Sequence, residues 1–270
     1  MKHFFSLLFL LFSFSLFSQT KPENFAFFQN LNGERKVFAD TAIIRIAPSS
    51  GAAVNDTLFL GDDINVLMQV PYSEVKNNVA FPWLKITYKK GVFVKVGFIS
   101  AIDIAINDKA SMKENEFVWG ISSAIRKDTL MNNETVFVNH YLGKVKVKTN
   151  KNKWINASLE IPSAMMVDTV VSSVFKRIKL SSSKGVIQID VTSTKNKALV
   201  YQYNFIYCNK NKLAQLETIN SIQKTQMGLK PITSFYKYFS NKIVFVMSGF
   251  MDGDKEIESY KLSDCSIIKI

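Results

Sequence analysis

Histidine and cysteine are scarce in this chain of 270 residues. It has two of each: His3, His140, Cys208 and Cys265. Zinc sites take several histidines or cysteines as ligands, and iron–sulfur clusters take a set of cysteines. The scarcity of these residues therefore excludes most zinc enzymes, iron–sulfur proteins and haem proteins. We expect no metal and no other cofactor.

Long apolar runs are also lacking, except near the amino terminus. Phe4–Phe17 follows a lysine and is interrupted only by serines, and it is shorter than the ~20 residues of a membrane-spanning helix. A positive start, a short apolar run and small residues after it are typical of a secretory signal peptide. We expect residues 1–18 to be removed after Ser18, with Ser13 and Ser15 forming a second possible site. The mature protein is then exported, periplasmic or secreted, with no membrane span.

Export changes how the two cysteines are interpreted. In an oxidising compartment an even number of cysteines usually means a disulfide. A bridge between Cys208 and Cys265 would close a loop of 57 residues, which stabilises the fold by roughly 4 kcal/mol in the chain-entropy model. Two separate buried thiols are the alternative.

Basic residues exceed acidic ones, 34 to 22, for a formal charge of +12. Many of the lysines alternate with asparagine in short polar segments, an arrangement typical of solvated turns. These segments are Asn150–Lys153, Lys195–Lys197 and Asn209–Lys212. Attraction to anionic envelope polymers is the functional alternative. No basic helix or aromatic-basic groove pattern is present, so we expect no nucleic-acid partner.

The first third of the mature chain has short apolar runs separated by turns. We expect an irregular lead-in over residues 19–36, a small closed barrel of five strands over 37–106 and a linker over 107–115, because a small sheet must curl to protect its edges. The expected strands are Ile43–Ile46, Thr57–Leu60, Ile64–Val70, Trp83–Tyr88 and Val92–Ile99.

Four segments of this region, in order, resemble a bacterial Src homology 3-like domain. They are Asp40–Ser49, Leu58–Asp62 with the following Ile64–Leu67, Trp83–Ile86, and Gly97–Ser100. The chain departs from the family pattern at Ile44, where asparagine is usual, and in a long loop over Pro71–Pro82. The resemblance implies a barrel that binds a cell-wall peptide or glycan, or an envelope protein.

The best binding candidates in this region are aromatic, since aromatic grooves suit peptides and glycans. Tyr72, Trp83, Tyr88 and Phe98 are the expected ligand-binding residues, with Phe81 beside them. In a barrel this small, Trp83 and Phe98 are equally suited to the core.

Domains of this kind accompany cell-wall cysteine endopeptidases and zinc amidases, but the catalytic residues of both are missing. The cysteine enzymes place their cysteine before their histidine, whereas His140 precedes both cysteines. The Gly-x-Ser-x-Gly turn of serine hydrolases is absent as well. His140 lies in the strand-like run Thr135–Leu142. We therefore expect a protein that is not an enzyme.

Residues 116–270 alternate between apolar and polar side chains and predict an antiparallel β meander, a sandwich or open barrel. Lys144–Lys148 predicts lysines outward and valines inward. The spacing of the apolar residues over 167–178 is helical, although their β-branched side chains favour a strand. The protein as a whole is expected to be mainly β.

Two further features keep alternative functions open. Tyr201, Tyr203, Phe205 and Tyr207 share one strand face and would line the cavity of a small-ligand carrier, or else pack inside a sandwich. The acidic cluster Asp252, Asp254, Glu256 and Glu258 would supply the carboxylate pair of a glycan hydrolase. Asp252-Gly253 is equally a hairpin-turn signal.

Overall fold

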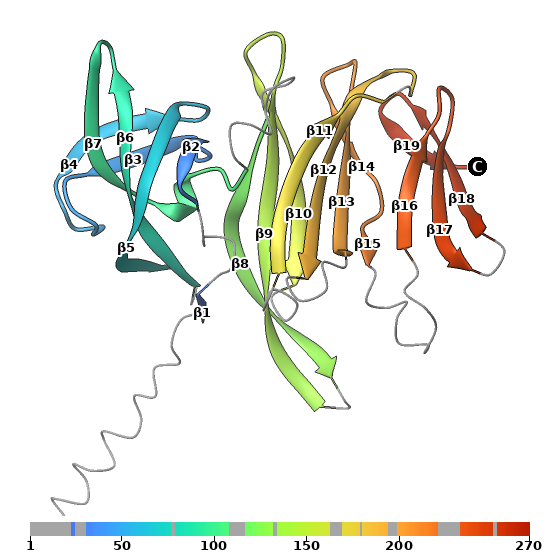
Figure 1. Ribbon diagram of the computed structural model, residues 1–270, viewed down its shortest axis with the longest axis horizontal. Coiled ribbons are helices and arrows are strands. Elements are labelled where there is room, and N and C mark those ends of the chain that lie inside the picture. Colours follow the sequence, from blue (N-terminus) through green and yellow to red (C-terminus); the bar gives the residue numbers. More distant parts are fainter. Residues whose placement is uncertain are drawn as a thin grey trace, which may run out of the picture.

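The computed structural model describes residues 23–24, 31–76, 79–107, 117–131, 134–162, 169–178, 180–193, 199–220, 233–250 and 253–270. The chain is mainly β and its strands pair antiparallel, except for the short strand β1, which pairs parallel with β6. Two regions stand side by side in Figure 1: an N-terminal unit (residues 23–24 and 31–107) and a sheet stack (residues 117–270). Within the described residues no helix reaches the length and apolarity that a membrane crossing requires.

The N-terminal unit is built on one curled sheet with the strand order β2-β5-β6-β7-β3-β4. Its strands are β1 (Glu23–Asn24), β2 (Gly33–Lys36), β3 (Thr41–Arg45), β4 (Val54–Phe59), β5 (Asp63–Lys76), β6 (Val79–Lys90) and β7 (Phe93–Ser100), followed by the 3-10 turn η2 (Ala101–Asp103). All five expected strands are present at the expected places.

The sheet is not closed into a barrel, in contrast to the expectation. No ladder joins the end strands β2 and β4 in the described part of the chain. Single backbone hydrogen bonds take its place: Val37 N donates to Asp62 O at 2.9 Å, and Gly61 N donates to Val37 O at 2.9 Å. Gly61 has a φ of +90°, so the tight turn after β4 brings these groups together where a side chain would be strained.

Strand β2 lies in residues 19–36, where only an irregular lead-in was expected. It has no apolar alternation, because its buried side chains are Arg35 and Lys36. Arg35 donates to the backbone carbonyls of Leu31 and Ile106, and Lys36 donates to Gly61 O. Charged groups can be buried when they are hydrogen-bonded. Because hydropathy assigns charged residues to the surface, it could not indicate this strand.

The expected long loop over Pro71–Pro82 is instead the end of a β-hairpin. Strands β5 and β6 continue to Lys76 and from Val79, and Ser73 pairs with Pro82. The register shifts between Gln69 and Ser73. A bulge of this kind accommodates Pro71, which has no N–H to donate.

The sheet stack has three antiparallel sheets. The inner sheet contains β8 (Phe117–Met131), β9 (Glu134–Lys148) and β10 (Trp154–Pro162). The middle sheet contains β11 (Thr169–Lys176), β12 (Ser183–Ser193), β13 (Leu199–Cys208), β14 (Leu213–Gln215) and β15 (Ile219–Asn220). The outer sheet contains β16 (Thr233–Tyr238), β17 (Ile243–Phe250), β18 (Gly253–Ser263) and β19 (Ser266–Lys269).

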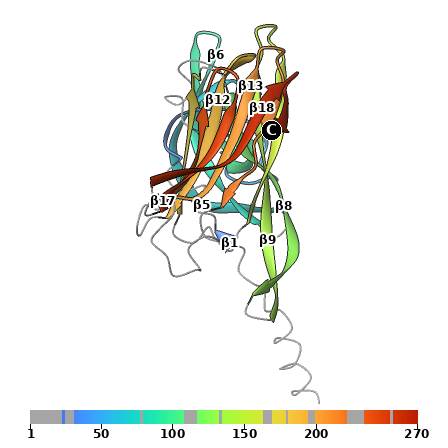
Figure 2. The same cartoon turned by 90° about the vertical axis from the view of Figure 1, so that its right-hand side faces the viewer.

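These sheets are layered face to face. They follow one another along the long axis in Figure 1, and they overlap when viewed along that axis in Figure 2. Strand β11 occupies most of the segment over 167–178 for which a helix was the alternative, so the β-branched residues prevailed over the helical spacing.

The middle sheet is covered on both faces. Tyr201, Tyr203, Phe205 and Tyr207 point toward the inner sheet and belong to one apolar core with residues of the inner sheet and the N-terminal unit. Tyr203 donates its hydroxyl proton to Glu160 O of β10 at 2.9 Å. The aromatic stripe is therefore packed between two sheets.

The opposite face of the same strands carries a buried polar ladder. Asp190 accepts hydrogen bonds from Gln188 and Gln202, Gln202 accepts one from Asn204, and Tyr238 of the outer sheet donates to Asn204 Oδ1 at 3.3 Å. Gln202 and Asn204 are buried. Pairing within the ladder offsets the cost of removing these amides from water.

A disulfide joins the middle and outer sheets. It links Cys208, the last residue of β13, to Cys265 in the turn between β18 and β19, with an S–S distance of 2.01 Å. It closes the loop of 57 residues and holds the carboxy-terminal hairpin against the middle sheet.

Asparagine occupies the tight positions of the turns in the stack. Asn152, between β9 and β10, has a φ of +57°, and Asn211, between β13 and β14, has a φ of +58°. Asparagine tolerates this left-handed conformation better than most residues. The segment Lys195–Lys197 lies outside the described residues, as does the expected signal peptide.

The N-terminal unit packs on the face of the inner sheet that is turned away from the middle sheet. Phe38 lies so close to Gly120 that a Cβ there would come within 2.8 Å of its ring, and Trp154 is equally close to Gly61. The same interface buries a lysine.

Lys146, which was expected to point into solvent, is only 8% exposed. Its ammonium donates to Phe38 O at 2.9 Å and to Asp40 at 2.8 Å. Asn107, the first residue of the expected linker, is also buried, bonding to Phe117 O and Trp119 N.

Candidate binding site on the N-terminal unit

The four aromatic residues expected to bind a ligand do not share one surface. Trp83 is only 4% exposed and Tyr88 is buried, whereas Tyr72 is 59% exposed and Phe98 is half-buried. The pairing of β6 with β7 shows why these aromatic side chains lie on different surfaces. Trp83 and Phe98 lie on one face of the β6–β7 pair, while Tyr88 belongs to the other face, with the core. Phe81, assigned to the long loop, is buried as well.

Tyr88 nevertheless borders a surface pocket of about 460 Å³. The pocket lies at one end of the curled sheet, between the β4–β5 turn and the ends of β5, β6 and β7. Its walls are formed by Glu34, Thr57, Leu58, Phe59, Asp62, Asp63, Ile64, Asn65, Thr87, Tyr88, Lys89, Lys90 and Val94. Carboxylates, ammonium groups and apolar side chains thus face the same space.

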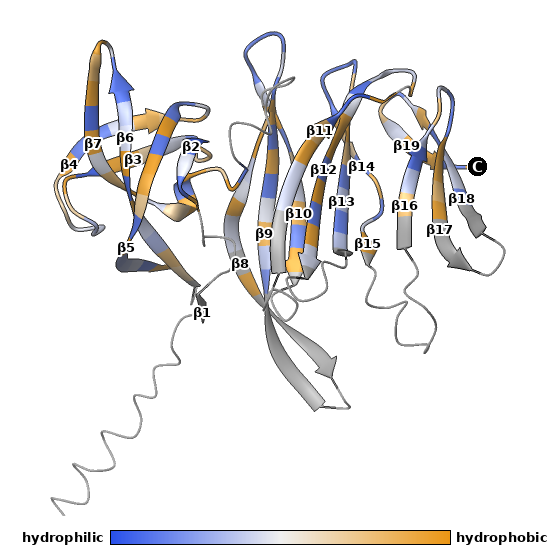
Figure 3. Ribbon diagram, viewed as in Figure 1, coloured by the Kyte–Doolittle hydropathy of each residue, from blue (hydrophilic) through white to orange (hydrophobic). Residues whose placement is uncertain are grey.

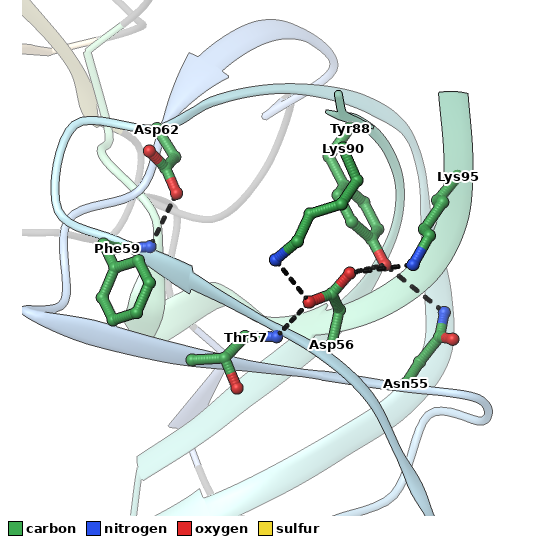
Figure 4. Close-up of polar contacts among 8 residues, drawn as sticks. All are labelled: Asn55, Asp56, Thr57, Phe59, Asp62, Tyr88, Lys90 and Lys95. Carbon is green, nitrogen blue, oxygen red and sulfur yellow. Dashed lines mark hydrogen bonds and ion pairs between the residues drawn. The ribbon is translucent and has the colours of Figure 1, made fainter. Parts of the chain in front are cut away.

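An ionic cluster around Asp56 lies beside the pocket (Figure 4). The Asp56 carboxylate accepts hydrogen bonds from Lys90 Nζ at 2.9 Å and Lys95 Nζ at 3.1 Å. It also accepts the backbone N–H of Thr57 at 2.9 Å, and the Tyr88 hydroxyl lies 3.5 Å away. The cluster ties the edge strand β4 to the β6–β7 hairpin across the open end of the sheet.

The cluster keeps Asp56 ionised and Tyr88 protonated beside the pocket. The hydrogen bond from Lys90, followed by that from Thr57 N, holds the pKa of Asp56 far below its usual range. Burial, and then the negative charge of Asp56, raise the pKa of Tyr88. A carboxylate that binds a proton so weakly is a poor general base at neutral pH, so the cluster suits binding better than acid–base catalysis. Lys90 and Lys95 remain about half exposed and keep donors for a ligand.

Phe59 and the loop after it complete the pocket wall. The Asp62 side chain accepts the backbone N–H of Phe59 at 2.8 Å, an arrangement that fixes the turn leading into β5 (Figure 4). Phe59 is 57% exposed. It is an apolar surface that a ligand would cover.

The alternative sites gain no support. Asp252 lies outside the described residues, and the side chains of Asp254 and Glu256 are not described; Phe250 and Gly253 pair as in a tight hairpin. His140 lies in β9, where Nδ1 is 2.5 Å from Glu160 Oε1. Glu258 accepts hydrogen bonds from Tyr260 and Lys269. Among the described residues no three His, Cys, Asp or Glu side chains gather as a metal site would require.

Comparison with known proteins gives no match to a family model, to a curated protein or to a solved structure.

Sequence reasoning missed Asp56, Lys90 and Lys95 as a group. They come from three strands and are 34 and 39 residues apart, so no local spacing links them. The available signal was the position of Asp56 two residues before the buried Leu58 and so on the same strand face, since a charge on a core-facing position needs a partner.

Proposed function

We propose that this chain is a non-enzymatic binding protein of the cell envelope and that its N-terminal unit carries the ligand site. The observation behind the proposal is the mixed character of the pocket beside Asp56. Glu34, Asp62 and Asp63 contribute carboxylates, and Lys89 and Lys90 contribute ammonium groups. A ligand that bears both charges, such as a peptide with free amino and carboxyl groups, matches such a lining.

Size and shape support the same proposal. A pocket of about 460 Å³ is within the range that holds small molecules or a short stretch of peptide, roughly 300–1,000 Å³. The resemblance to a bacterial Src homology 3-like domain and the expected signal peptide favour a cell-wall peptide as the ligand. The scarcity of histidine and cysteine favours binding over metal or cysteine catalysis.

The test is co-sedimentation of residues 19–270 with purified cell-wall sacculi over a salt series. The informative variant is Phe59→Ser, because Phe59 is exposed in the pocket and its loss leaves the core intact. Phe239→Ser is the matched control, an exposed phenylalanine on the distant outer sheet. Trp83→Ala is unsuitable, because Trp83 is buried and its removal would damage packing.

We expect binding that salt weakens but does not abolish, because charges paired within a pocket are screened less than those on an open surface, and that falls in Phe59→Ser and is unchanged in Phe239→Ser. Binding that disappears with salt in all three proteins would reduce the interaction to the basic surface of the sheet stack. Equal binding by Phe59→Ser and the unaltered chain would exclude the pocket.

A further inference from the structure

The β6–β7 hairpin has an apolar tip. Its turn is Gly91-Val92, and exposure rises to 90% at Val92 and 70% at Phe93, with Val94 and Val96 also exposed. Figure 3 shows hydrophobic residues at the start of β7, at the end of a hairpin that stands clear of the sheet stack. Exposed apolar groups gathered in this way indicate an interaction surface.

The other turns of the molecule show that this tip is unusual. Those between β9 and β10, β13 and β14, and β16 and β17 are polar: Thr149–Lys153, Asn209–Lys212 and Phe239–Lys242 contain mainly asparagine, serine and lysine. Turns normally favour such residues. Gly91 supplies the positive φ of +61° that the turn needs, so Val92 has no conformational role that a polar residue would not fill.

Lysines flank the tip. Lys89, Lys90 and Lys95 lie close to the Gly91-Val92 turn, Lys85 lies further back in β6, and residues 85–98 contain no acidic residue. The nearby carboxylate of Asp56 is already ion-paired with Lys90 and Lys95. The hairpin itself therefore combines a protruding apolar end with lysines on both of its strands, and the carboxylates that face Lys89 and Lys90 belong to the pocket beside it.

We propose that this hairpin docks the N-terminal unit on an anionic lipid bilayer. Val92 and Phe93 would enter the boundary between headgroups and acyl chains, while the lysines would lie among the headgroup phosphates. Apolar insertion and attraction to anionic lipid act together in peripheral membrane binding. The hairpin surface adjoins the pocket, because Lys89, Lys90 and Val94 also line it, but Val92 and Phe93 lie outside the pocket lining.

The test is sedimentation of residues 19–270 with vesicles of phosphatidylcholine, with and without phosphatidylglycerol. We expect binding to the mixed vesicles, weakened by salt, and about tenfold or more weaker for Phe93→Ser, since it removes the transfer free energy of one aromatic side chain. Phe239→Ser is the matched control: it is 41% exposed, lies beside a turn and has Lys242 over its ring at 5.5 Å, yet belongs to the outer sheet. It should bind as the unaltered protein does.

A second measurement keeps the insertion itself falsifiable. In Phe93→Trp, the tryptophan emission should shift to the blue with mixed vesicles and be quenched by brominated acyl chains.

The absence of vesicle binding would overturn the proposal. Binding that salt removes and that Phe93→Ser leaves unchanged would assign the interaction to the basic stack and also overturn it. So would a dimer in sedimentation equilibrium that Phe93→Ser abolishes, because the tip would then contact a second copy. We expect Phe93→Ser to bind sacculi as the unaltered protein does, because Phe93 does not line the pocket, and this separates the present test from that of the pocket.

Discussion

The N-terminal unit and the sheet stack are both antiparallel β structures, yet their surfaces differ. Residues 31–107 contain eight basic and seven acidic residues, whereas residues 117–270 contain 22 and 11. Of the 16 large apolar side chains exposed in the described parts of the chain, eleven belong to the N-terminal unit. The positive charge of the protein therefore resides in the stack, and its apolar contact surface in the smaller unit.

The two regions also bury their polar groups differently. The stack encloses amides between sheets, where Asp190, Gln202 and Asn204 satisfy one another. The N-terminal unit places its ions at the open end of the sheet, around Asp56 and beside the pocket. Polar groups thus hold layers together in one region and remain accessible to a ligand in the other. Most of the exposed apolar side chains and the ions beside the pocket thus lie in the smaller unit, where we propose that a ligand binds.

The sharpest test of this comparison uses one residue type in both regions. Phe205 is fully buried in the middle sheet, and Phe93 is exposed at the hairpin tip. We expect Phe205→Ala to lower the free energy of unfolding by about 3–5 kcal/mol, and Phe93→Ala to change it by less than about 0.5 kcal/mol. Urea unfolding followed by circular dichroism measures both. Similar losses would show that the tip has a structural role.

Loss of the disulfide should affect the stack. The double variant Cys208→Ser with Cys265→Ser removes the closure of a loop of 57 residues, which lowers the free energy of unfolding by about 4 kcal/mol in the chain-entropy model. Guanidinium unfolding measures the change. Reductant should reproduce it in the unaltered protein and have no effect on the double variant. An unchanged midpoint would mean that the carboxy-terminal hairpin is held by packing alone.

The boundary between the regions depends on Gly120. A methyl group there would lie within 2.8 Å of the Phe38 ring, so Gly120→Ala should cost about 1–3 kcal/mol through overpacking. Gly51→Ala is the control, since its added methyl meets only Ser49 Oγ at 3.8 Å. Thermal unfolding should show a lower midpoint for the first variant only. Equal behaviour of the two would mean that the contact can adjust freely.

The smallest expected effect is the loss of stability when acid protonates Asp40. The hydrogen bond and charge of Lys146 lower the pKa of Asp40 from its usual value of 3.8. This ion pair therefore stabilises the fold above about pH 4, and the contribution is lost as the pH falls through the folded-state pKa. Because Asp40 is largely exposed, we expect a contribution below about 1 kcal/mol.

Comparison with Asp40→Asn tests this ion pair. The unaltered protein should melt slightly higher than the variant at pH 7, and the two should converge once the pH falls below the lowered pKa of Asp40. A difference that persists in acid would show that Asp40 acts through something other than its charge.

Much of the local structure was evident in the sequence. Alternating side chains indicated β12 and β13, short apolar runs indicated five strands of the N-terminal unit but not β2, and asparagine–lysine segments marked the turns at Asn152 and Asn211. These signals are local, because a strand presents every second residue to one face and a tight turn needs particular backbone angles. The expected mainly β fold is confirmed, with antiparallel sheets.

The candidate site was predicted only in part. Residues 37–106 were identified as the binding region, and Tyr88 does border the pocket. Trp83 was buried instead, and the Asp56 cluster was not anticipated. Hydropathy shows that a residue is aromatic or charged, but the identity of its partner depends on which strands the fold brings together.

Local sequence patterns located most of the strands and turns, though not β2, and showed that two cysteines were available to pair. Which sheet faces are covered depends on contacts between strands that lie far apart in the chain. Lys146 and Asn204 lie on polar strand faces that local alternation directs toward solvent, yet both are buried, under the N-terminal unit and the outer sheet respectively. The physical reason is that alternation separates the two faces of one strand, whereas burial depends on what packs against each face from elsewhere in the chain.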